Sequence, residues 1–384
     1  MKIIVSSVFS RTRYRDFVGS RDSRMGFADG FRRLGHEVYV FEDVAEPDCL
    51  DSEGREVPFR RWDGRRTFRD VMDAYGFGDT SCLIYDGGRD TWGMDWTACR
   101  EAARGADLLL AVGGRFRTPE ILDSVGHRAY VDINPGKTQV YAFEYDVDYG
   151  LDAFDSHFSV GLAVGTPGCP LPTGGLRWRP LTWPVVMERW AREVPAGEAF
   201  STLTSWGRKH VFSFQGTDSG DKVEQWLRFL DLPGRTDRRM EIGLPAHTVD
   251  SGDLDRLRDH GWSVRDSGRL RSLDDYVGWV AGSRAEFSVA NGRYVRFRTG
   301  WFSDRTSRFL AAGRPVLVQS TGIEDHLPVG EGLLTFGTME EAADGIERID
   351  RDYDLHVEAA RDFAREHSAS GRVLTGLLKE VGLA

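Results

Sequence analysis

Short apolar runs alternate with amphipathic stretches along most of the chain. The first run, KIIVSSVF at residues 2–9, is rich in β-branched residues, which is typical of a strand buried on both faces. A helical pattern follows at residues 24–35 and ends on Gly35, and residues 36–43 predict the next strand. This strand, helix, strand order predicts a parallel sheet.

The same pattern continues in both halves of the chain. Further strands are expected in the first half at 81–88, 106–114 and 127–136, and in the second half at 199–206, 238–244, 285–291, 315–320 and 332–337. Helices are expected at 221–233, 251–261 and 339–367, the last with Ala342, Ile346 and Ile349 on one face. Ligands bind at the C-terminal ends of such strands, so those ends are the places to look for a site.

The stretch at residues 171–186, LPTGGLRWRPLTWPVV, differs from both halves because it is rich in Pro, Gly and Trp. Such a composition suits a connection between domains. We therefore expect an α/β protein with two Rossmann-like domains, residues 1–185 and 186–365, that face each other across a cleft. A final helix at about 366–384 is expected to pack back on the first domain.

Composition narrows the class of protein. A formal net charge of −10 argues against nucleic-acid binding, which depends on clustered cations. The four cysteines are scattered, without the spacing of a zinc site or a disulfide framework, which fits a reduced cytoplasm. No window approaches the roughly 20 apolar residues of a membrane span, and the N-terminal apolar run is too short for a signal peptide. These features predict a soluble cytoplasmic protein; they leave its oligomeric state open.

One helix start stands out as a candidate anion site. Ser303 or Asp304 can cap a helix that runs to about Ala312, where Gly313 and Pro315 stop it. The free N–H groups and the dipole of such a helix start favour a phosphate. Seven arginines and two acids lie between residues 284 and 314, so the sign of the charge reverses locally. Solvated surface is the alternative explanation for these arginines.

The block GWFSDRTSRFLAAGRPVLVQSTGIEDHLPVGEGLLTF at 300–336 resembles the donor half of GT-B glycosyltransferases, in an uncharacterised bacterial group near the spore-maturation-type and retaining GT-B transferases. YVDINPGKTQ at 130–139 and FDSHFSVG at 154–161 are similar to blocks of its N-terminal half. The resemblance implies a GT-B fold with an N-terminal acceptor-side domain and a C-terminal donor domain. It also shows a departure, because retaining enzymes often carry two glutamates where this chain has Gly300 and Arg308.

The resemblance implies a hexosyltransferase-like enzyme that moves a sugar from a nucleotide-diphosphate donor, such as a UDP or dTDP sugar, to a hydroxyl of a small-molecule or glycan acceptor. No metal and no further cofactor are expected. The donor phosphates are expected to bind Ser303, the backbone N–H of Asp304, and Arg305. Further expected donor contacts are Ser205, Arg208, Lys222, Thr321 and Gly322.

The acceptor hydroxyl must lose a proton, and an imidazole that titrates near neutrality or a carboxylate can accept it. The candidates for this catalytic role are His157, Asp132 and Glu286. Each has a structural alternative: a buried strand histidine, a turn-capping aspartate, and a glutamate paired with Arg284 or Arg293. Acceptor contacts are expected from Gln139, Trp92 and Trp96, although loop tryptophans can equally serve packing.

Two other functions fit the same architecture. A nucleotide-sugar epimerase would convert its donor without an acceptor, and a binding module could keep the cleft without catalysis. The DVD tripeptide at 146–148 resembles a metal-binding motif of other transferases, but a surface turn in an acidic chain explains it equally well. NPGKT at 134–138 lacks the first glycine of a phosphate-binding P-loop.

Overall fold

The computed structural model describes residues 1–11, 18–192, 194–207, 211–245, 247 and 249–384, and the chain forms two parallel-dominated sheets. The first has the order β4-β3-β2-β1-β5-β6-β7-β8, and β4 alone among these strands runs antiparallel to its neighbour. We call this sheet with its helices the first lobe. Its strands are β1 (Lys2–Ser7), β2 (Glu37–Val44), β3 (Ser81–Tyr85), β4 (Asp90–Gly93), β5 (Leu108–Val112), β6 (His127–Asp132), β7 (Ser156–Ser159) and β8 (Trp178–Pro180).

The second lobe is built on a six-stranded sheet of order β13-β12-β9-β14-β15-β16, parallel throughout. Both sheets grow outward from their first strand in two directions, which is the doubly wound arrangement of Rossmann-like domains. The prediction of an α/β fold with two such domains is confirmed. The strands are β9 (Ala199–Leu203), β12 (Arg239–Leu244), β13 (Ser263–Asp266), β14 (Ala285–Ser288), β15 (Val316–Gln319) and β16 (Leu333–Phe336), with a separate hairpin of β10 (Ser213–Phe214) and β11 (Thr217–Asp218).

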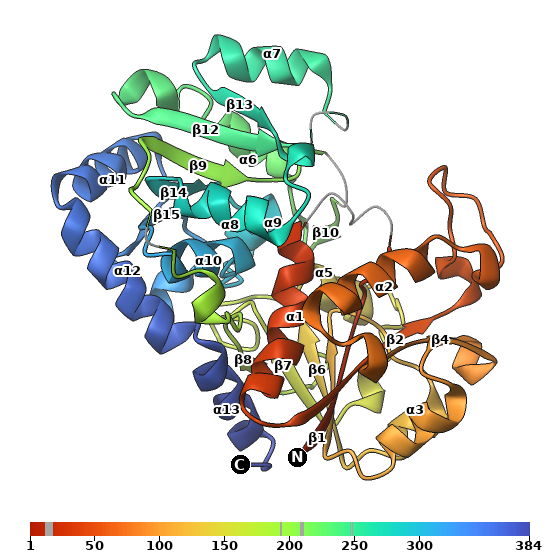
Figure 1. The fold of residues 1–384 in the computed structure, drawn as a ribbon. Coiled ribbons are helices and arrows are strands. Elements are labelled where there is room, and N and C mark those ends of the chain that lie inside the picture. Colours follow the sequence, from red (N-terminus) through yellow and green to blue (C-terminus); the bar gives the residue numbers. More distant parts are fainter. Residues whose placement is uncertain (12–17, 193, 208–210, 246, 248) are drawn as a thin grey trace.

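Helices cover both sheets, and the last three run along one side of the molecule from the second lobe back to the first (Figure 1). No helix in the described part of the chain is long and apolar enough to cross a membrane. The helices are α1 (Val18–Arg33), α2 (Gly64–Tyr75), α3 (Trp96–Ala103), α4 (Pro119–Leu122), α5 (Lys137–Phe143), α6 (Lys222–Leu227), α7 (Ser251–Asp259), α8 (Leu273–Ala281), α9 (Gly292–Arg296), α10 (Asp304–Ala311), α11 (Met339–Arg351), α12 (Tyr353–His367) and α13 (Ser370–Glu380).

Two segments differ from their sequence-based description. The stretch at 171–186 contains β8, which pairs with β7 and so extends the first sheet. The supposed acceptor loop that carries Trp92 is the edge strand β4, paired with β3. Both are short edge strands with little apolar pattern of their own, and Pro180 is tolerated in β8 because an edge strand needs fewer backbone donors.

The lobes are joined by backbone hydrogen bonds between two loops. The amides of Leu162 and Ala163 donate to the carbonyls of Gly300 and Thr299, at 3.0 and 3.1 Å. A Cβ on Gly300, which has a φ of +65°, would lie 2.6 Å from the backbone nitrogen of Ala163. Gly300 therefore allows the lobes to approach each other.

The C-terminal helix α13 packs on the first lobe. Leu374, Leu377 and Leu378 belong to the same buried cluster as Phe27 and Phe31 of α1. The contact with α1 is close, because a Cβ on Gly30 would lie 2.6 Å from the Cδ1 atom of Leu374. The end of the chain thus contributes to the core of its beginning.

This packing predicts that Leu374→Ala lowers the free energy of unfolding by about 2–5 kcal/mol, since a fully buried leucine leaves a cavity when truncated. Denaturant unfolding followed by circular dichroism measures the change. The control is Leu355→Ala, where the side chain is 49% exposed and the expected change is below about 0.5 kcal/mol. Equal effects of the two substitutions would contradict the docking of α13.

Candidate functional site

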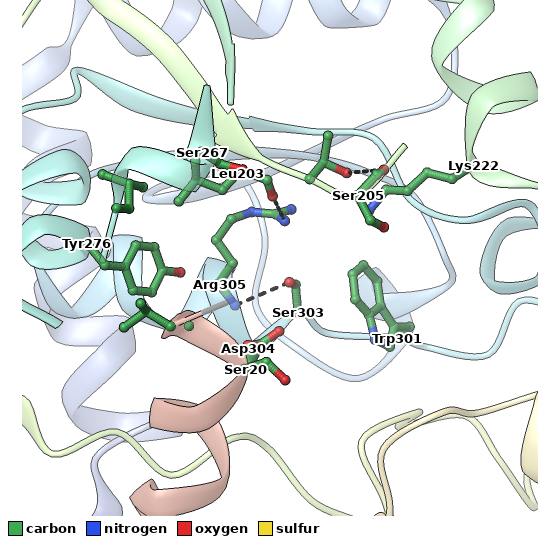
Figure 2. Close-up of a pocket in the computed structure, with 14 residues that line it drawn as sticks. Ser20, Leu203, Ser205, Lys222, Ser267, Tyr276, Trp301, Ser303, Asp304 and Arg305 are labelled. Carbon is green, nitrogen blue, oxygen red and sulfur yellow. Dashed lines mark hydrogen bonds between the residues drawn. The ribbon is translucent and has the colours of Figure 1, made fainter. Parts of the chain in front are cut away.

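A cavity of about 220 Å³, which we call the interlobe pocket, lies between the start of α1 and the second sheet. The first lobe contributes Val18, Gly19 and Ser20 to its lining. The second lobe contributes the residues that follow β9 and β13 and the starts of α6 and α10. Figure 2 shows Ser20 and Asp304 at one end, with Tyr276 across the pocket from Lys222 and Trp301. The pocket therefore lies where a doubly wound sheet binds ligands, at the C-terminal ends of its strands.

The start of α10 faces this pocket, with Ser303, Asp304 and Arg305 in its lining. Ser303 is the N-cap, and its Oγ accepts a hydrogen bond from the Arg305 amide at 3.3 Å. The helix ends at Ala311, and Gly313 follows with a φ of +68°, so the predicted capped helix is confirmed. The Asp304 amide has no acceptor within the described residues, which leaves it and the helix dipole available to an anion.

Arg305 lines the pocket, but its guanidinium is already hydrogen-bonded to other residues of the second lobe. Its Nε donates to Oε1 of Glu286 at 2.5 Å, and its remaining nitrogens donate to the Ser288 hydroxyl and the Leu203 carbonyl. Glu286 is fully buried in β14. The Glu286 carboxylate, a candidate proton acceptor in the sequence, is thus the counter-ion of Arg305, and its partner is neither Arg284 nor Arg293.

Lys222 is the pocket's unpaired cation. It is the first residue of α6, is half-buried, and has no hydrogen bond or ion pair with any described residue. Burial, together with the positive charges of Arg305 and Arg293, lowers the pKa of Lys222 to about 7. A lysine in this state gains a favourable partner when an anion enters the pocket.

Three polar side chains of the pocket were not predicted from the sequence. Tyr276 is 3% exposed, and its hydroxyl has no hydrogen-bond partner among the described residues; burial raises its pKa. The buried hydroxyl of Ser267 likewise lacks a partner. The Asp304 carboxylate is the one acidic side chain in the pocket's described lining, and it too is unpaired. Ser267 directly follows β13, a strand that the sequence did not predict, so the rule that ligands bind at strand ends could not identify it.

The other expected donor contacts fall into three groups. Ser205 is exposed and lines the pocket. Thr321 is buried, donates to the Trp301 carbonyl at 3.0 Å, and with Gly322 supports the turn before α10 instead of lining the pocket. Arg208 lies outside the described residues.

Asp132 and Gln139 form a buried turn network, away from the pocket lining. The fully buried Asp132 carboxylate accepts hydrogen bonds from the Asn134 amide, Thr138 Oγ1, Gln139 Nε2 and Ser159 Oγ, at 2.6 to 2.9 Å. Burial raises its pKa, and the four donors oppose that effect. Asp132 therefore has the turn-capping role that was the alternative to catalysis, and Gln139 is its partner.

The remaining first-lobe candidates are also placed elsewhere than the pocket. His157 is buried, its Nε2 lies 2.9 Å from the Leu151 carbonyl, and its ring packs edge-on against Trp178. Burial lowers the pKa of His157, which favours the neutral ring. Trp92 lies on β4 with the Arg65 guanidinium 3.7 Å from its ring, and Trp96 begins α3. All three have packing roles in this structure.

The positive cluster seen in the sequence is largely neutralised. Five of the seven arginines between residues 284 and 314 form ion pairs with carboxylates, namely Arg284–Asp350, Arg296–Glu224, Arg298–Asp325, Arg305–Glu286 and Arg308–Asp22. The expectation that these arginines create an open anion site is therefore wrong for most of them. The positive or hydrogen-donating groups of the pocket that have no partner among the described residues are the Asp304 amide at the α10 start and Lys222.

No protein-family profile and no curated protein sequence matches the chain. Similar solved structures include Anabaena Alr3699/HepE in complex with UDP and glucose, with 10% identity, 100% of both chains covered and a TM-score of 0.57. An alpha-glucosyltransferase in complex with UDP-glucose and DNA has 12% identity, covers 99% of this chain and 98% of its own, and gives 0.56. Sucrose-phosphate synthase from Thermosynechococcus elongatus gives 10%, 99% of both chains and 0.52. This full-length similarity and the two doubly wound sheets show that the chain has the GT-B fold.

Proposed function

We propose that the protein is a glycosyltransferase that binds a nucleotide-diphosphate sugar in the interlobe pocket and transfers the sugar to a hydroxyl of a small-molecule or glycan acceptor. One observation carries the proposal: the start of α10 and the unpaired Lys222 face the same pocket between two Rossmann-like lobes. The UDP and UDP-glucose bound to proteins of similar fold support this choice of ligand class.

The diphosphate would bind the free Asp304 amide, the Ser303 hydroxyl and Lys222. Negative charge builds on the leaving phosphate as the bond to the sugar breaks, and fixed donors stabilise that charge without reorganising. A single such contact can be worth about 3–4 kcal/mol of transition-state stabilisation. In the proposed reaction these protein groups stabilise the diphosphate in place of a metal ion, and no further cofactor takes part.

The other end of the pocket suits a nucleoside. Leu203 and Leu270 supply apolar walls, and the Ser267 and Tyr276 hydroxyls lack partners that a polar base or ribose edge could provide. An unsatisfied buried hydroxyl destabilises the free protein by about 1–3 kcal/mol, and ligand binding would relieve this. The pocket thus offers a charged end and a hydroxyl end, as a nucleoside diphosphate requires.

The proposed proton acceptor is the Asp304 carboxylate. It is the acidic group that the described residues bring to the pocket, and Ser20 of the first lobe lines the pocket at the same end. An acceptor that enters from the first lobe would meet this carboxylate beside the transferred sugar. The proposal replaces Asp132, His157 and Glu286, none of which lines the pocket.

A thermal-shift panel of UDP, dTDP, GDP and ADP, with their glucose conjugates, tests the ligand class. A nucleotide at 100 times its dissociation constant should stabilise the folded protein by about 2.7 kcal/mol. The matching nucleosides, which lack the diphosphate, should give much smaller shifts. Absence of any shift across the panel would overturn the proposal, and consumption of a donor without an acceptor would favour the epimerase.

The lowered pKa of Lys222 predicts that donor affinity depends on pH. A bound diphosphate favours the charged lysine, so affinity should be highest below about pH 7 and fall by up to about tenfold per pH unit above it. A nucleotide sugar is the suitable ligand, because its diphosphate does not itself titrate in this range. Isothermal calorimetry between about pH 6 and about pH 9 measures the dependence.

Lys222→Met should weaken binding by about tenfold or more at pH 6 and remove the pH dependence. Lys379→Met, at an exposed position of α13, is the matched control and should leave both the affinity and its pH profile unchanged. A variant at position 222 that keeps the wild-type pH profile would contradict the assignment of Lys222.

A further inference from the structure

A buried ion pair crosses from one lobe to the other beside the pocket. Arg308 of α10 is 0% exposed and Asp22 of α1 is 4% exposed. The Arg308 Nε donates to Oδ2 of Asp22 at 2.8 Å, and its Nη2 lies 2.7 Å from the same oxygen. The two residues are 286 positions apart in the sequence, so only the docking of the lobes brings them together.

Each partner is tied to a wall of the pocket. The Nη1 of Arg308 donates to the carbonyl of Asp304 at 2.6 Å, one helical turn earlier in α10. Asp22 lies about one turn after Val18, Gly19 and Ser20, the residues of α1 that line the pocket. A displacement of Arg308 relative to Asp22 would therefore change the width of the pocket at the end where Ser20 and Asp304 face it.

The surroundings of the pair hold it in one geometry. The Tyr75 hydroxyl donates to Oδ1 of Asp22 at 3.0 Å, and Arg189 lies 3.8 Å from that oxygen with its guanidinium 4.5 Å from the Tyr75 ring. The Trp190 ring lies 5.6 Å from the Arg308 guanidinium. Arg189 and Trp190 belong to the segment that joins the two sheets, so this segment closes the network between the lobes.

We propose that Asp22 and Arg308 are positioning residues that clamp the start of α10 against α1 and so preform the donor pocket. The effect on the donor rests on the proposed function, whereas the effect on lobe spacing does not. A buried charge without its counter-ion is strongly unfavourable, because the desolvation of the remaining charge is no longer compensated. Removal of either partner should therefore let water enter the seam and separate the two walls.

The test uses the full chain with Asp22→Asn, which removes charge with little change in size, Arg308→Gln, which removes charge and shortens the side chain, and Arg308→Lys, which keeps the charge. Calorimetry measures the dissociation constant of whichever of UDP, dTDP, GDP and ADP binds wild type most tightly. Small-angle scattering of the nucleotide-free protein measures lobe separation. Circular dichroism establishes that each variant is folded, and Asp22→Asn, the most conservative change, serves if Arg308→Gln does not fold.

We expect Asp22→Asn and Arg308→Gln to raise the dissociation constant about tenfold or more and to increase the radius of gyration, with a clearly smaller effect for Arg308→Lys. The control is Tyr145→Phe, which removes a different contact between the two halves of the chain. The Tyr145 hydroxyl donates to the Ser213 carbonyl at 2.7 Å and accepts from the Ser213 amide at 3.2 Å. This substitution should leave the affinity within about twofold of wild type.

Two results would overturn the proposal. Folded Asp22→Asn that binds the nucleotide as wild type does would show that the pair does not position the pocket. An equal loss of affinity in Tyr145→Phe would show that any loosening of the seam has the same effect. If wild type binds none of the four nucleotides, the proposed function fails, but unchanged scattering in Asp22→Asn would still reject the clamp and an expanded profile would support it.

Discussion

The docking of the turn before α10 against the first lobe is the constraint on which the rest of the structure depends. Backbone hydrogen bonds from Leu162 and Ala163 fix this turn, and Gly300 allows the approach because it has no Cβ. The contact places the start of α10 at a lobe boundary, where its free amide faces a pocket. The same helix start buried inside one lobe would not face a pocket.

Charge in this protein is arranged so that few cations remain free near the pocket. Glu286 neutralises Arg305 inside the sheet, and Asp22 neutralises Arg308 across the lobes. Both arginines therefore form structural ion pairs, since a buried guanidinium requires a counter-ion. Lys222 has no counter-ion among the described residues. Burial and the nearby arginines lower its pKa, and an incoming anion would stabilise its charged form.

The structure shows what Gly300 and Arg308 do at the two positions where retaining GT-B enzymes often carry glutamates. Arg308 pairs with Asp22 of the other lobe, and Gly300 packs against the backbone of that lobe. The carboxylate that faces the pocket is Asp304, one turn before Arg308. Under the proposed function, other groups of the pocket would contact the donor, and the buried, unpartnered Ser267 hydroxyl and the Tyr276 hydroxyl that lines the pocket are suited to this.

The sequence by itself predicted the central strands of both sheets, several helices and the capped start of α10, because periodicity, β-branched runs and capping residues act over a few neighbouring positions. It did not predict the short edge strands β4, β8 and β13, whose local patterns are weak, or helices such as α2, α3 and α8. It did not determine which polar residues face the pocket. Asp132 and Glu286 have the chemistry of catalytic groups, yet neither lines the pocket: Asp132 is hydrogen-bonded to Gln139, and Oε1 of Glu286 is paired with Arg305 in the core. Ion pairing and burial are decided by residues far apart in the chain, so only the tertiary structure separated structural charges from free ones.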